Sequence, residues 1–190
     1  MRKLLLLTAA LACMALMIVW RSPASSFAQD IPKESKTQPK AVVLSKDSQS
    51  DKYGDVGFNH ENHSVKMYSP DGKTVLACIE CHHTDQPAAG LKPPLKTSER
   101  DVVLTAAILQ AADSKAVKTC RACHLQAGDD SGTIPAVQYP DKPAATKLTN
   151  EIAYHVNCNL CHDKAIAARP ALKGKVPGSN DCLPCHKPIS

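Results

Sequence analysis

The chain has 190 residues, a formal net charge of +5 and only seven aromatic residues. This length suits one domain, but so few aromatic side chains cannot fill a core to the density of a protein interior. Three basic residues and no acidic residue fall within the first 28 positions, so the remainder of the chain carries only +2. That balance excludes the strongly basic surface of a typical nucleic-acid-binding protein.

Residues 1–28 have the pattern of a secretory signal peptide. Two basic residues precede an apolar run, Leu4–Trp20, and Ser26–Ala28 resembles an A-x-A cleavage site. A retained membrane anchor is the alternative, but a run of 17 residues is at the short end of what spans a bilayer. A lipoprotein site at Cys13 is disfavoured because the apolar run continues beyond it. We expect export to the periplasm, cleavage before Gln29, and no stable membrane span afterwards.

The polar residues 29–52 predict a flexible leader, and residues 53–190 form the expected folded domain. Within the leader, only Ala41–Leu44 has the composition of a short strand, which we expect to pair with Asp55–Phe58 as a minor N-terminal β-hairpin. A turn is expected at 69–72, where Ser-Pro precedes Asp-Gly.

Two helices are expected further along the chain. Ser98 is the predicted cap of a helix that runs to Ala112, and its apolar residues cover most of the helix circumference, which calls for burial on more than one side. Thr149 or Asn150 is the predicted cap of the second helix. The segments 84–119 and 125–151 contain long Pro- and Gly-rich connectors. The expected fold class is therefore mostly α with much irregular loop.

The sequence C-x-x-C-H occurs four times in the expected mature chain, which is the attachment signature of c-type haem. Two thiols at this spacing add to the two vinyl groups of one porphyrin, and the following His can reach the iron. The cysteines concerned are Cys78, Cys81, Cys120, Cys123, Cys158, Cys161, Cys182 and Cys185. Zinc sites and thioredoxin-like redox sites also use C-x-x-C, but four copies each followed by His are far more specific. We expect four covalently bound haem c groups.

Four haems would account for two further properties of the sequence. Once Cys13 leaves with the signal, all eight remaining cysteines belong to the motifs, and none is left for a disulfide. The large apolar macrocycles would replace the missing core, so the expected fold is small and built around its cofactors. Their propionates would bring the net charge of the mature protein to about −6, which again argues against nucleic-acid binding.

The histidines match the number of axial positions on four irons. The chain has eight, and four of them close the motifs. The expected iron ligands are His60, His63, His82, His83, His124, His155, His162 and His186. The mature chain has one methionine, Met67, so a Met ligand could serve at most one haem. We expect every iron to carry two imidazoles.

Full ligation favours an electron carrier over an enzyme. A haem enzyme needs a vacant or labile iron position for its substrate, whereas a saturated iron can only exchange electrons. Two imidazoles keep the potential low compared with a His/Met pair. A small multihaem reductase with an open haem site is the alternative, and a structural protein with four zinc sites is a third hypothesis.

These motifs resemble those of the tetrahaem class III cytochromes c, the cytochrome c3 family. Phe58–His63 resembles the family's F-x-H-x-x-H segment, Cys78–His83 is similar to its C-x-x-C-H-H, and His155–Cys158 resembles the H-x-x-C start found in larger multihaem relatives. The resemblance covers about 56–187. It differs from many compact members in having two residues between the cysteines at every site and in its long connectors.

The resemblance implies ligand pairs, a fold and a role. Haem 1 would have His82 and His60, haem 2 His124 and His83, haem 3 His162 and His63, and haem 4 His186 and His155. It implies a cytochrome c3-like fold and a periplasmic carrier between hydrogenase or formate dehydrogenase and a membrane redox complex in anaerobic respiration. The departures suggest a variant that serves a membrane complex.

Overall fold

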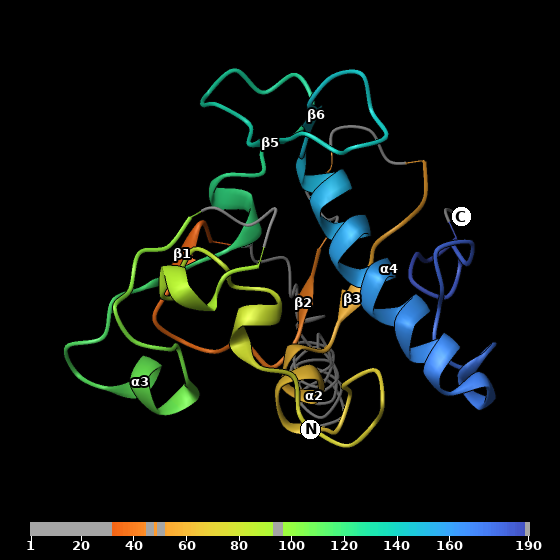
Figure 1. Cartoon of the computed structure of the whole chain (residues 1–190), viewed down its shortest axis with the longest axis horizontal. Coiled ribbons are helices and arrows are strands. Elements are labelled where there is room, and N and C mark those ends of the chain that lie inside the picture. Colours follow the sequence, from red (N-terminus) through yellow and green to blue (C-terminus); the bar gives the residue numbers. More distant parts are fainter. Residues whose placement is uncertain (1–31, 45–47, 49–51, 93–96, 189–190) are drawn as a thin grey trace, which may run out of the picture.

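The computed structural model describes residues 32–44, 48, 52–92 and 97–188 (Figure 1). The expected signal peptide and its cleavage site lie outside these residues. Within the described part of the chain, no helix has both the length and the apolar character needed to cross a bilayer.

Short elements joined by irregular segments make up the described chain. The α-helices are α2 (His60–Val65), α3 (Ala106–Gln110) and α4 (Asn150–Ala168). The 3-10 helices are η1 (Cys78–Glu80), η2 (Ala88–Gly90), η3 (Cys120–Ala122) and η4 (Pro170–Leu172). Three antiparallel strand pairs complete the fold: β1 (Glu34–Ser35) with β4 (Val117–Lys118), β2 (Val42–Val43) with β3 (Gly57–Phe58), and β5 (Ala136–Val137) with β6 (Thr146–Lys147). More of the described residues are in helices than in strands, and more are in irregular segments than in either.

The N-terminal hairpin forms where the sequence places it. Val42 pairs with Phe58 and Val43 with Gly57, inside the two segments expected to form strands. The structure differs from a wholly flexible leader over 29–52, because β1 also pairs with β4 and the Thr119 hydroxyl donates to the Pro32 carbonyl at 2.9 Å. This part of the leader therefore contacts the segment just before the second motif.

The long helix α4 begins at the predicted residue. The Oγ1 of Thr149 accepts a hydrogen bond from the backbone N–H of Ile152 at 3.4 Å and so caps the first turn. At the other end, the Arg169 guanidinium donates to the carbonyls of Ser69 and Pro70 at 3.2 and 3.0 Å. These bonds hold the expected turn at 69–72, where Gly72 adopts a φ of +75°, against the end of α4.

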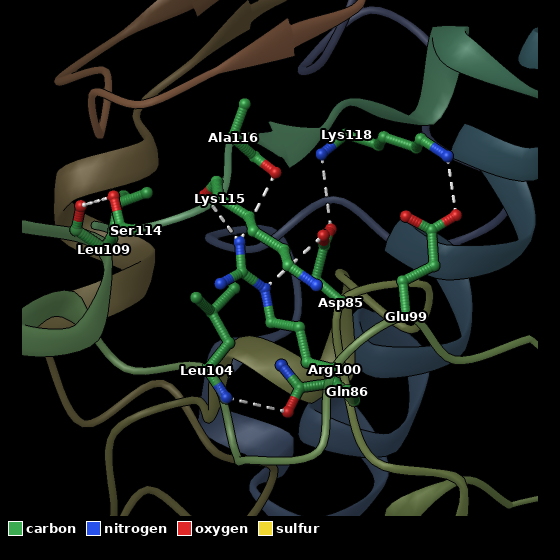
Figure 2. A network of polar contacts seen from close by, with 10 residues as sticks. All are labelled: Asp85, Gln86, Glu99, Arg100, Leu104, Leu109, Ser114, Lys115, Ala116 and Lys118. Atoms are coloured by element: carbon green, nitrogen blue, oxygen red, sulfur yellow. Dashed lines mark hydrogen bonds and ion pairs between the residues drawn. The ribbon is translucent and has the colours of Figure 1, made fainter.

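The predicted helix over 98–112 is wrong for most of its length. Only α3 is helical there, and Thr105 rather than Ser98 caps it by accepting from the Ile108 N–H at 3.2 Å. The preceding residues are held in an irregular path by buried long-range contacts: the Arg100 side chain reaches Asp85, and the Leu104 N–H donates to the Gln86 side chain (Figure 2). Local apolar pattern alone could not reveal these partners.

The described chain contains very little conventional hydrophobic core. Its buried hydrophobic residues are Leu104, Val117, Leu125 and Ala165. Two of these four belong to the connector between the first and second motifs, and the nearly inaccessible polar residues Asp85 and Gln86 lie in the same connector. In Figure 1 the short helix α3 of this connector lies well apart from α4. Among the described residues, the connector thus holds two of the four buried hydrophobic side chains and three of the four buried polar or charged ones, the fourth being His124 of the second motif.

The cap of α4 provides a stability test. Changing Thr149 to Ala removes the acceptor for the Ile152 N–H, which should lower the free energy of unfolding of the purified protein by about 1 kcal/mol. Thr149→Ser keeps the hydroxyl and is the matched control. Denaturant unfolding followed by far-UV circular dichroism measures both, and equal stabilities for the two variants would contradict the cap.

Candidate cofactor-binding site

Each C-x-x-C-H segment forms one helical turn. In three motifs the backbone N–H of the His donates to the carbonyl of the first Cys: His82 to Cys78 at 2.8 Å, His124 to Cys120 at 2.8 Å and His186 to Cys182 at 2.9 Å. The third motif lies within α4. Because residues three and four apart share one side of a helical turn, both sulfurs and the imidazole are offered to the same side.

Helix α4 brings the four motifs together. Beyond carrying the third motif, it supplies Asn157, whose side-chain N–H donates to the Cys81 sulfur at 3.4 Å, and Tyr154, whose hydroxyl hydrogen-bonds the Cys120 sulfur. The ring centroids of His155, also on α4, and His186 of the fourth motif are 6.1 Å apart. Residues 154–158 of a single helix therefore contact or belong to all four motifs.

Six of the eight histidines lie in ring pairs. Ring centroids are 6.2 Å apart for His60 and His82, 6.2 Å for His83 and His124, and 6.1 Å for His155 and His186. For the other two histidines, the pKa of His162 is lowered mainly by burial and further by the charge of His63. Each of the three ring pairs joins a motif histidine to one of the four outside that position, and these three coincide with pairs that the family resemblance implies.

The centroid distances fit a metal ion held between two rings. Two imidazole nitrogens about 2.0 Å from a metal on opposite sides, with ring centres about 1.1 Å farther out, give centroids about 6.2 Å apart. The three measured separations of 6.1 to 6.2 Å match this value. Ordinary edge-to-face ring contacts have centroids about 4.5–7 Å apart and include the same distances, so the separations are compatible with ligation but not specific to it. The residues present therefore fit bis-imidazole ligation of iron.

Backbone carbonyls fix the orientation of many of these rings. The Nδ1 atoms of His63, His124, His162 and His186 lie 2.8, 2.7, 2.9 and 3.1 Å from the carbonyls of Asn59, Leu148, Pro177 and Gly54. A carbonyl can only accept, so Nδ1 carries the proton and Nε2 keeps its free lone pair. Ligating histidines generally use this arrangement, in which the second nitrogen is held by an acceptor.

Local electrostatics favour the neutral imidazole that binds metal. Burial is the main cause that lowers the pKa of His60, His82, His83 and His162. At His60 and His83 the neighbouring histidine of the same pair lowers the pKa further. Since metal binding requires the neutral ring, these environments reduce the competition from protons.

Burial disfavours the thiolate form of at least three of the motif cysteines. Burial raises the pKa of Cys120 and of Cys158 to about 11 each, and it raises that of Cys81 as well. Reactive cysteines and zinc ligands are thiolates, held by surroundings that lower the pKa. Among the described residues, no group of three or more His, Cys, Asp or Glu side chains is arranged to hold a metal ion.

Apart from Phe58, which begins the F-x-H-x-x-H segment noted above, several residues at the site were not identified from sequence. Phe58 and Tyr68 flank the His63 ring at centroid distances of 4.6 and 5.3 Å, and Tyr53 lies 5.5 Å from the His186 ring. The scarce aromatics thus gather beside the histidines. Two further residues of the site are Asn157, between His155 and Cys158, and Asp85, close after the C-x-x-C-H-H segment. Their closeness to the motifs in sequence was the only clue to a role at the site.

Comparison of the chain with known protein families, curated proteins and solved structures gives no significant match.

The pairing predicts the effect of removing one ring at a time. Changing His60, His63, His83 or His155 to Ala should leave one of four irons without its second imidazole, converting about a quarter of the haem to the high-spin form. Absorption and electron paramagnetic resonance spectra measure this fraction. Met67→Ala is the control that should remain fully low-spin, because the Met67 side chain is 63% exposed. A high-spin haem in the control would contradict complete bis-imidazole ligation.

Proposed function

We propose that this chain is an exported, low-potential electron carrier with four covalently attached haem c groups, each ligated by two histidines. The observation that carries the proposal is the pairing of six of the eight histidines, with three centroid separations of 6.1 to 6.2 Å. The proposed place of action is the periplasm, between a hydrogenase or formate dehydrogenase and a membrane redox complex, as the resemblance to the cytochrome c3 family suggests.

The chain's own residues would attach, orient and shield the cofactors. The eight motif cysteines would form the thioether links, and the eight histidines would ligate the irons, four of them with their rings held by backbone carbonyls. When bound, the haems supply reversible one-electron chemistry. If two histidines ligate each iron, no coordination position would be left for a substrate, which favours the carrier over the alternative of a small multihaem reductase. Burial raises the pKa of Cys158, and the charges of Cys81, Cys185 and Cys120 raise it further. This proximity of cysteines from all four motifs supports closely spaced haems.

The covalent haem count tests the proposal directly. Protein expressed with a cytochrome c maturation system and extracted with acid–acetone should keep four haems, and its intact mass should correspond to a chain that starts near Gln29. Changing both cysteines of one motif to Ala, for example Cys182 and Cys185, should reduce the count to three and is the internal control. Fewer than four haems on the unaltered chain, or ready binding of carbon monoxide by its reduced form, would overturn the proposal.

Charge along the chain suggests where a partner protein docks. Residues 142–190 hold seven basic and three acidic groups, or +4, while residues 29–141 hold 13 basic and 15 acidic groups, or −2. Lys164, Lys173, Lys175 and Lys187 are exposed and lie near the third and fourth motifs in sequence. The family's lysine-rich face at haem 4 implies a docking surface there for an acidic partner. Plain solvation of the surface is the alternative role of these lysines.

Docking through these lysines predicts sensitivity to salt. Electrostatic steering raises association rates by roughly 10–10³-fold and fades as salt shortens the Debye length, which is about 10 Å at 0.1 M. Electron transfer with the physiological partner, followed by stopped-flow absorption, should slow as ionic strength rises. Lys173→Glu with Lys175→Glu should slow it at low salt, whereas the control pair Lys92→Glu with Lys115→Glu makes the same change in net charge elsewhere. Equal rates for the two pairs would contradict docking at the C-terminal segment.

A further inference from the structure

The polar segment 32–44, here called the N-terminal strap, is tied to the rest of the fold at both of its ends. At its start, β1 pairs with β4, and the Thr119 N–H donates to the Lys33 carbonyl at 2.9 Å. At its end, β2 pairs with β3, and the Leu44 N–H donates to the Val56 carbonyl at 2.9 Å. In Figure 1 the strap is the orange segment that includes β1 and β2.

Between these two ends the strap contacts helix α2. The Lys40 carbonyl accepts a hydrogen bond from the backbone N–H of Glu61 at 3.0 Å, and the side-chain amide of Gln38 donates to the Ser64 hydroxyl at 2.7 Å. Glu61 is in the first turn of α2, where backbone N–H groups have no partner within the helix. The strap therefore holds the start of the helix through its backbone and the end through a side chain.

Helix α2 needs support from outside, because it has only six residues and none of them is buried. Helices of this length are not stable by themselves in water. Asn59 caps the helix by accepting from the Asn62 N–H at 2.8 Å, which satisfies one further donor. The strap adds an indirect contact, since Val42 pairs with Phe58, whose ring centroid lies 4.6 Å from that of His63. The orientation of α2 thus depends strongly on the strap.

Helix α2 carries two of the four proposed iron ligands that lie outside the motifs. His60 is its first residue, with its ring centroid 6.2 Å from that of His82, and His63 follows one turn later. We propose that the strap is a positioning element that fixes these two ligands and so keeps the irons of haems 1 and 3 closed to external ligands. This inference rests on the proposed function. Haems 2 and 4 would take their second ligands from His83 and His155, which lie outside α2.

The strap would act on how often these irons open. An iron with two histidines can bind an external ligand only after one histidine has dissociated. Dissociation of His60 or His63 requires movement of the short helix that carries them, and the hydrogen bonds from the strap oppose that movement. Loss of one ordinary protein hydrogen bond should raise the population of the open form roughly fivefold.

Binding of carbon monoxide by the reduced holoprotein measures this opening. Gln38→Ala removes the donor to Ser64 and should raise the slow rate of carbon monoxide binding roughly fivefold. Gln138→Ala is the matched control, because it removes the same exposed side chain from another part of the chain, where it donates to the Tyr139 and Lys142 carbonyls. The control should leave the rate unchanged.

Three further measurements separate this role from a general loosening of the fold. Nuclear magnetic resonance of isotope-labelled carbon monoxide, with His60→Ala and His63→Ala as references for the two sites, should place the added binding at haems 1 and 3. In a Ser64→Ala background, Gln38→Ala should have no further effect, because its acceptor is gone. Adding Leu44→Pro to Gln38→Ala removes a second hydrogen bond of the strap and should raise the rate by roughly another fivefold.

The outcomes that overturn the inference differ from those that overturn the proposed function. Equal rates in Gln38→Ala and Gln138→Ala would refute a role of the strap in closing the irons. So would an increase spread evenly over all four haems, or an undiminished effect of Gln38→Ala in the Ser64→Ala background. A wrong haem count or rapid binding of carbon monoxide by the unaltered chain would instead refute the carrier itself, and both are measured without any strap variant.

Discussion

The contact on which this structure depends is the meeting of two imidazole rings from distant parts of the chain. The ring pairs span from 22 residues, between His60 and His82, to 41 residues, between His83 and His124. Each pair closes a loop that no hydrophobic core would otherwise close, since only four hydrophobic side chains of the described residues are buried. Hydrogen bonds from ring nitrogens to backbone carbonyls then fix how the rings face one another.

Helix α4 is the common support for these pairs. Its His155 ring lies beside His186 of the fourth motif. The Asn157 side chain donates to a sulfur of the first motif, and the Tyr154 hydroxyl forms a hydrogen bond with a sulfur of the second. Such a concentration of contacts on one rigid element limits the relative movement of the four sites. In the proposed carrier, this limits the change in haem separation during electron transfer, and so keeps reorganisation small.

Sequence anticipated the site better than the fold around it. Motif spacing and histidine number are local or countable properties, and they identified the residues that the structure brings together, such as His155 and His186. The start of α4 was also predictable, because Thr149 caps the helix with its own side chain. By contrast, the path of 98–104 depends on contacts with Asp85 and Gln86, which lie more than ten residues away in sequence. The local sequence of 98–104 therefore could not reveal it. The pairing of β1 with β4 was missed for the same reason.

The pairing of histidines determines which kind of cross-link would stabilise this fold. Exported domains with small cores usually depend on disulfide cross-links, which restrict the unfolded chain. Here every described cysteine lies in a C-x-x-C-H motif, and in the proposed holoprotein the cross-links would be metal–imidazole bonds instead. Such links would resist thiol reductants, which unlock disulfides, and would yield to acid, which protonates the imidazoles. The stability of the fold would thus depend on the iron–imidazole bonds rather than on whether the compartment is oxidising or reducing.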